Sequence, residues 1–314
     1  MSLLIIGSIA LDTIETPFGK VEMELGGSAT FSSLAAALHT HPSIIGVIGD
    51  DFPQQHLQML QEKGVNTTGV VQQPGKTFHW EGAYDYNLNS AQTKKTELGV
   101  FADFHPDTFD RFQEFSFVFL GNIHPALQLA VLEKTAASAP FTAVDTMNFW
   151  IESEKDLLTE VISRVDLVFM NEGEARQYTG HYNLLQAARS ILSRGPKYLM
   201  IKQGEYGAVL FSNDQLFSIP GFLLETVKDP TGAGDSFAGG VMGYLSNYFQ
   251  TLENYDAKPK FRDVFTFDTM KTAMVQGNIL ASFTVEEFGT GRLVTVSTKE
   301  LDERYGVFQS LVSF

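Results

Sequence analysis

Short apolar runs alternate with amphipathic stretches along most of the chain. The runs lack a polar face, as strands buried on both sides of a sheet do, and they occupy residues 3–9, 43–48, 115–120, 142–145, 167–170 and 198–202. Helical periodicity is found between them, at residues 28–38, 53–63 and 125–139. This alternation predicts an α/β fold in which helices cover both faces of a mostly parallel sheet.

Two segments depart from this pattern, because their apolar residues alternate with polar ones and no helical stretch covers them. Residues 13–25 are predicted to form a hairpin that turns at 17–20, and residues 76–100 contain alternating aromatic and polar positions. We expect a small β lid formed by about residues 12–25 and 76–101; the alternative is a surface hairpin packed on its own domain. No repeat or linker divides the chain, so we expect one domain over residues 1–314.

The composition narrows the class of protein. The chain has 314 residues, enough for one large core, and its net charge of −15 disfavours binding to nucleic acids or anionic membranes. It contains no cysteine, no apolar stretch long enough to span a membrane and no basic region near its first residues. We therefore expect a cytoplasmic protein with no nucleic acid and no membrane as a partner, and the composition agrees with a soluble enzyme.

Residues 229–240, Asp-Pro-Thr-Gly-Ala-Gly-Asp-Ser-Phe-Ala-Gly-Gly, carry the clearest chemistry. Apolar residues at helical spacing predict a helix over 236–249, whose first free N–H groups would belong to Ala233, Gly234 and Asp235. Because Gly232 and Gly234 have no side chains, a phosphate can approach these amides, and the helix dipole favours its charge. Asp235 is then either a base that takes a proton from an attacking hydroxyl or a helix cap.

Further motifs precede this segment along the chain. They are Gly7 with Asp12, the pair Gly26 and Gly27, residues 46–52 (Gly-Val-Ile-Gly-Asp-Asp-Phe), 171–174 (Asn-Glu-Gly-Glu) and 202–207 (Lys-Gln-Gly-Glu-Tyr-Gly). In this order and at this spacing, the motifs resemble the PfkB/ribokinase family of carbohydrate and nucleoside kinases. The resemblance implies a ribokinase-like three-layer fold and ATP-dependent transfer of the γ-phosphoryl group to a hydroxyl of a small sugar. It makes Asp235 the general base and the amides of residues 232–234 the anion hole.

The resemblance also implies contacts with the nucleotide and its Mg²⁺. Asn171 and Glu174 would organise Mg²⁺ through water, because Mg²⁺ gives up its hydration reluctantly; the alternative is a capping arrangement for a short helix. The lysine of the 202–207 motif would meet the phosphates, and its glycines would let the backbone pass close to the nucleotide. Asn278 lies eleven residues before Gly289, which resembles the spacing of the family's adenine-side asparagine. The remaining nucleotide contacts that the resemblance implies are thus Lys202, Gly204, Gly207 and Asn278.

On the acceptor side, the resemblance points to a carboxylate and two glycines. A carboxylate such as Asp12 can accept two hydrogen bonds from sugar hydroxyls, while Gly26 and Gly27 let the ring approach the main chain. Phe31 is a departure, since many members have an asparagine there, and this argues against a strict ribokinase preference. The other expected members of the acceptor and phosphate site are Asn122, Asp145 and Asn148.

Two further expectations concern ions and assembly. In members activated by monovalent cations, an aspartate and the residue two positions later contribute to a K⁺ site, and these positions are Asp229 and Thr231 here. Aromatic residues of one strand parity in the lid predict a homodimer formed through it; they are Phe78, Trp80, Tyr84 and Tyr86.

Other functions are also compatible with the sequence. One is a nucleoside kinase of the same family, and another is a catalytically silent protein that senses a sugar or a nucleotide on the same fold. A dinucleotide-dependent dehydrogenase is disfavoured, because Phe237 stands where the third glycine of the dinucleotide fingerprint should be. The sequence leaves open which acceptor, which hydroxyl and which nucleotide are used.

Overall fold

The computed structural model describes residues 3–105, 115–138, 140–253 and 264–313. Its centre is a nine-stranded sheet with the order β13-β12-β11-β10-β9-β8-β1-β4-β5. Neighbouring strands from β5 to β11 are parallel, and β12 and β13 continue the sheet antiparallel. The prediction of a mostly parallel sheet is therefore confirmed. The strands are β1 (Leu3–Ile6), β4 (Ser43–Ile48), β5 (Asn66–Gln72), β8 (Phe117–Leu120), β9 (Phe141–Val144), β10 (Leu167–Asn171), β11 (Tyr198–Lys202), β12 (Ala208–Phe211) and β13 (Leu216–Ile219).

Helices cover both faces of this sheet, because successive side chains of a strand enter different hydrophobic cores. Along β1, Leu3 and Ile5 belong to one core, whereas Leu4 and Ile6 belong to the other. The first core includes residues of α1 (Ser28–Ala37), α8 (Ala233–Glu253), α10 (Phe267–Thr284) and α12 (Thr298–Val312). The second includes residues of α3 (Pro125–Thr135), α5 (Lys155–Arg164), α6 (Glu172–Thr179) and α7 (Leu184–Leu192). In the described ranges, no helix has the length and apolarity needed to cross a bilayer.

Helix α8 packs closely against α1, and glycines make this approach possible. A Cβ atom at Gly239 would lie 2.1 Å from the backbone oxygen of Ser32, and one at Gly243 would lie 2.8 Å from the Cα of Ala36. The helix begins at Ala233 and not at the predicted residue 236. Asp235 therefore lies in its first turn, which corrects the expected helix boundary.

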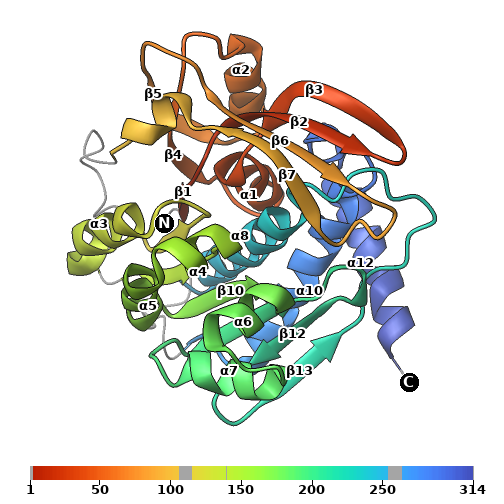
Figure 1. Cartoon of the computed structure of the whole chain (residues 1–314). Coiled ribbons are helices and arrows are strands. Elements are labelled where there is room, and N and C mark those ends of the chain that lie inside the picture. Colours follow the sequence, from red (N-terminus) through yellow and green to blue (C-terminus); the bar gives the residue numbers. More distant parts are fainter. Residues whose placement is uncertain (1–2, 106–114, 139, 254–263, 314) are drawn as a thin grey trace.

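A separate four-stranded sheet, which we call the lid, crosses the upper part of the molecule as drawn (Figure 1). Its order is β3-β2-β6-β7, with β2 and β6 parallel and the other neighbours antiparallel. The predicted hairpin over 13–25 is present, with longer strands than expected. The lid strands are β2 (Ala10–Thr16), β3 (Gly19–Gly26), β6 (Phe78–Tyr84) and β7 (Ala91–Glu97), and the remaining helices are α2 (Gln54–Glu62), α4 (Asn148–Ser153) and α11 (Gly291–Thr295).

Candidate active site

A cavity of about 820 Å³ opens where the parallel strands end, the place at which open α/β sheets bind ligands. Its wall includes the residues at or after the carboxyl ends of β9, β10 and β11, the first turn of α8 and the end of lid strand β6. These elements are far apart in the sequence. The predicted site residues that line the cavity are Asn122, Asp145, Asn171, Glu174, Lys202, Gly204, Gly207, Ala233, Gly234, Asp235 and Asn278.

Asp235 is held at the start of α8 by contacts of its backbone. The hydroxyl of Ser32 on α1 donates a hydrogen bond of 3.0 Å to the Asp235 carbonyl oxygen. Burial raises the pKa of the Asp235 carboxyl to about 7; the charge of Asp145 adds to this shift and Lys202 opposes it. The side chain therefore gains and loses a proton close to neutral pH, unlike an ordinary surface aspartate.

The amides in front of α8 are fewer than expected. The N–H group of Ala233 donates to the carbonyl oxygen of Pro230 at 3.2 Å, because the chain makes a tight turn before the helix. The N–H group of Asp235 lies against its own carboxyl, and this contact lowers the pKa of that carboxyl. Among the described residues, no hydrogen bond uses the N–H group of Gly234. Of the predicted amides, Gly234 is thus the one that remains open toward the cavity.

Gly232 shapes this turn in two ways. Its φ angle is +75°, which favours glycine. A Cβ atom at this position would also lie 2.3 Å from the ring of Phe31. Phe31, which departs from the family pattern, therefore packs directly beneath the turn that leads into α8.

Lys202 is the one cationic side chain among the described residues that line the cavity. Its Nζ lies 2.5 Å from Oδ2 of Asp145, and both side chains are largely buried. Burial raises the pKa of Asp145, although the charge of Lys202 opposes this shift. A Cβ atom at Gly234 would lie 3.1 Å from the Lys202 Nζ, so the ammonium is next to the free amide. Asp145, expected in the acceptor and phosphate site, thus holds the cation that faces the start of α8.

Asn171 and Glu174 form a complete capping box at the start of α6. The Asn171 N–H donates to Oε2 of Glu174 at 2.7 Å, and the Glu174 N–H donates to Oδ1 of Asn171 at 2.8 Å. Burial raises the pKa of Glu174 to about 7. No cluster of three or more His, Cys, Asp or Glu suited to a metal ion occurs in the part of the chain that the structure describes. A pair of side chains on the cavity wall fits a metal held through water better than a cage of direct ligands.

The nucleotide-side motif forms a turn after β11. Gly204 and Gly207 have φ angles of +59° and +94°, which explains why glycines stand there. A Cβ atom at Gly204 would lie 2.2 Å from Oδ1 of Asn89, so the tip of the β6–β7 hairpin rests on this turn. Asn278, on α10, donates to the carbonyl oxygen of Pro220 at 3.2 Å and lines the cavity.

On the lid side, Asp12 is buried beside the two glycines expected with it. A Cβ atom at Gly26 would lie 1.9 Å from Oδ2 of Asp12, and one at Gly27 would lie 2.4 Å from the backbone oxygen of Ser8. Burial raises the pKa of Asp12 to about 8, with smaller contributions from the charges of Asp229 and Asp235. Its Oδ1 is buried and has no hydrogen-bond partner among the described residues. Asp12, Gly26 and Gly27 are not among the residues that line the cavity, although the charge of Asp235 is close enough to contribute to the raised pKa of Asp12.

The two remaining acceptor candidates behave differently. Asn122 lines the cavity, but its Oδ1 accepts a hydrogen bond of 2.9 Å from Trp150 and its Nδ2 donates to Sδ of Met147 at 3.1 Å. Asn148 is not among the residues lining the cavity, and its amide donates to Gln177 at 2.7 Å in an exposed contact between α4 and α6. The structure therefore does not bring Asn148 to the site.

Tyr84 lines the cavity, although no individual role was predicted for it. It ends β6, and its phenolic oxygen accepts a hydrogen bond of 3.3 Å from the hydroxyl of Thr231. Thr231 in turn is held by Asp229, whose Oδ1 accepts the Thr231 N–H and whose Oδ2 accepts the Gly289 N–H, both at 2.9 Å. The signal in the sequence that could have pointed to Tyr84 is the strand parity that it shares with the other lid aromatics.

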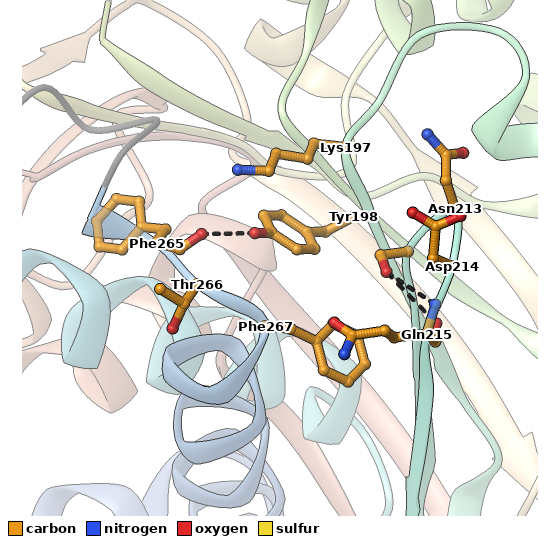
Figure 2. A pocket seen from close by; sticks show the side chains of 9 residues that line it. Lys197, Tyr198, Asn213, Asp214, Gln215, Phe265, Thr266 and Phe267 are labelled. Atoms are coloured by element: carbon orange, nitrogen blue, oxygen red, sulfur yellow. Dashed lines mark hydrogen bonds between the residues drawn. The ribbon is translucent and has the colours of Figure 1, made fainter.

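A second hollow lies away from these residues, where β11 begins. It is lined by Tyr198, Gln215, Thr266 and their neighbours, and the Tyr198 hydroxyl is bound to the carbonyl oxygen of Phe265 (Figure 2). None of the predicted site residues lines it. The chemistry therefore belongs to the larger cavity.

Comparison with known proteins identifies the family to which the chain belongs. The cytidine kinase of Thermococcus kodakarensis is 31% identical over 254 residues, covering 79% of this chain and 88% of the relative. The deoxyribokinase of Salmonella typhi is 26% identical over 236 residues, covering 73% and 76%. A solved E. coli protein in complex with ATP and Mg²⁺ has a TM-score of 0.76 at 17% identity, covering 98% and 99%. The family model for pfkB carbohydrate kinases matches residues 2–296, so the chain belongs to this family of phosphotransferases with alcohol acceptors.

Proposed function

We propose that the protein transfers the γ-phosphoryl group of ATP to a hydroxyl of a small sugar or of the ribosyl part of a nucleoside, with Asp235 as the general base. The observation that carries the proposal is the place of Asp235 in the first turn of α8, beside the unpaired amide of Gly234 and on the cavity that Lys202 also lines. A carboxyl whose pKa is about 7 can accept a proton from a hydroxyl and still be ionised at neutral pH.

The same end of the cavity offers groups for the charge of the transferred phosphoryl. The N–H group of Gly234 and the ammonium of Lys202 are neighbours there, and fixed donors of this kind stabilise the charge that develops in phosphoryl transfer. Asn171 and Glu174 are the side chains that would hold Mg²⁺ through water. When bound, the ion neutralises part of the triphosphate charge.

Asp12 is the residue that we propose binds the acceptor. A buried carboxylate oxygen without a partner can accept a hydrogen bond from an acceptor hydroxyl, which would repay part of the cost of burying it. A free sugar and a nucleoside both carry such hydroxyls. The similarity to a cytidine kinase supports the nucleoside, and the similarity to a deoxyribokinase supports the sugar.

A direct assay separates these acceptors. Purified protein with Mg²⁺ and ATP is offered ribose, 2-deoxyribose, cytidine and 2′-deoxycytidine, and the phosphorylated product is identified by mass spectrometry. We expect a product with at least one of them, its loss in Asp235→Asn and its retention in Asp214→Asn, which alters an exposed carboxylate far from the cavity. Nucleotide binding without any phosphorylated product would instead support the silent sensing protein.

Three further proposals accompany this function. Asp229 and Thr231 contribute to a K⁺ site that orders the turn before α8, and the protein works in the cytoplasm. The lid forms a homodimer, which the molar mass in solution tests. Each of the three β6 aromatics already has a contact within the chain, since Phe78 packs on Phe101, Trp80 donates to the hydroxyl of Thr93 and Tyr84 meets Thr231.

A further inference from the structure

Tyr84 connects the lid to the catalytic loop, by which we mean residues 229–235. The pairing of β6 with β2 is regular from Phe78 to Ala83, with Asp12 opposite Trp80. Since side chains alternate along a strand, Tyr84 continues the face of the lid on which Asp12 and Trp80 lie. Tyr84 and Asp235 also line the same cavity. The lid therefore presents a phenol to the cavity that Asp235 lines, and the charges of Asp12 and Asp235 both act on this phenol.

The hydrogen bonding of this phenol is incomplete within the protein. Its oxygen accepts the Thr231 hydroxyl at 3.3 Å, so Thr231 fixes the position of the oxygen. No acceptor for the phenolic proton is found among the described residues. Tyr84 is half-buried and lines the cavity, so a hydroxyl that uses only its acceptor capacity leaves one donor available to a bound molecule.

The surroundings keep this proton in place. Burial raises the pKa of Tyr84, and the charges of Asp229, Asp12 and Asp235 raise it further. The phenol therefore remains protonated at every pH at which the protein is expected to work. Its negative neighbours favour a donor at this position and disfavour a phenolate.

We propose that Tyr84 is an acceptor-binding residue carried by the lid, and that its phenolic hydroxyl, anchored on Thr231, donates a hydrogen bond to an oxygen of the acceptor. This inference rests on the proposed function. The reacting hydroxyl must direct its proton to Asp235, whereas a neighbouring oxygen is free to accept a hydrogen bond from Tyr84. The site thereby selects a polyhydroxylated acceptor, because Asp12 accepts a hydrogen bond from one hydroxyl and Tyr84 donates a hydrogen bond to another oxygen.

The hydrogen bond can be tested by Tyr84→Phe, which keeps the ring and removes the hydroxyl. We expect the acceptor KM to rise roughly 3–15-fold, the range for one lost hydrogen bond, while the ATP KM changes less than about twofold. Tyr182→Phe is the matched control, since it removes a hydroxyl from a tyrosine that is 89% exposed and does not line the cavity. Kinetics are measured with each of the four acceptors named above, and thermal melts verify that the variants are folded.

Thr231→Val supplies a second test, because it removes the anchor and leaves the phenol. If the anchor places the phenol, the effects of Tyr84→Phe and Thr231→Val on acceptor KM combine to less than their product. An unchanged acceptor KM in folded, active Tyr84→Phe contradicts this inference alone, as does an equal rise in both KM values. A wild-type protein that neither binds nor phosphorylates any of the four acceptors contradicts the proposed function as well.

Discussion

Removing the charge of Asp12 is predicted to stabilise the fold while it damages activity. The Asp12 side chain is buried, with a relative exposure of 4%, and burial raises the pKa of its carboxyl from an ordinary value of 3.8 to about 8. In the unfolded chain Asp12 ionises above about pH 4, whereas in the folded protein it resists ionisation up to about pH 8. The unfolded state is therefore increasingly favoured as the pH rises through this window. The loss of folding stability reaches its full size above the pKa of the folded state.

The size of this cost follows from the pKa difference. At 1.36 kcal/mol for each pKa unit, the shift corresponds to at most about 5–6 kcal/mol at alkaline pH. Asp12→Asn removes the charge but brings an N–H₂ group that must find partners in the same buried place, which costs about 1–3 kcal/mol. We expect a net gain of roughly 2–4 kcal/mol at pH 8, or several degrees in Tm.

Thermal melts of wild type and Asp12→Asn at pH 5, 6.5 and 8 test this reasoning, with Asp214→Asn as an exposed control. The advantage of Asp12→Asn should grow with pH and be smallest at pH 5. Its acceptor KM should rise most at pH 8, where part of the wild-type Asp12 is ionised, because an amide oxygen accepts a hydrogen bond from a hydroxyl less strongly than a carboxylate does. A Tm that falls at pH 8, or a gain independent of pH, would refute the assigned cost of the buried charge.

Two predictions concern ions. Glu174→Gln can still accept the Asn171 N–H, so the cap of α6 persists, but the lost charge should raise the Mg²⁺ concentration for half-maximal rate about 10–100-fold; Glu300→Gln, in the capping box of α12, is the control and should leave it unchanged. If Asp229 and Thr231 contribute to a K⁺ site, the rate should be higher in potassium than in tetramethylammonium, and equal rates would remove that proposal.

Much of the fold was predictable because its signals are local. Apolar runs without a polar face identified the central strands, and alternation identified the lid. The start of α8 was placed too late, at residue 236, because apolar periodicity marks the packed face of a helix and not its first turn. The parallel pairing of β2 with β6 joins distant segments, so no local pattern could reveal it.

The site was predictable where a motif fixed both residue type and position. Asp235, Lys202, Asn171 and Glu174 meet at one cavity, as their motifs implied. Asn148 was misplaced because its segment only approximates the family motif, and its amide bonds at the surface instead.

Contacts between elements that are distant in the chain could not be predicted from the sequence. The ion pair of Lys202 with Asp145 joins two motifs that are separate in the chain. The hydrogen bond between Tyr84 and Thr231 depends on the position of the lid over the catalytic loop. Neither pairing follows from residue spacing, since each spans different elements of the fold.

The central claim is that Asp235 acts as the general base, and turnover of Asp235→Asn tests it most directly. The variant keeps the size of the side chain, but an amide cannot take the proton of the acceptor hydroxyl. We predict a kcat lowered by about 10²–10⁴-fold, with the Kd for the non-hydrolysable analogue AMP-PNP within about twofold of wild type. A kcat close to that of the wild type would contradict the account and leave Asp235 as a residue of the first helical turn without a catalytic role.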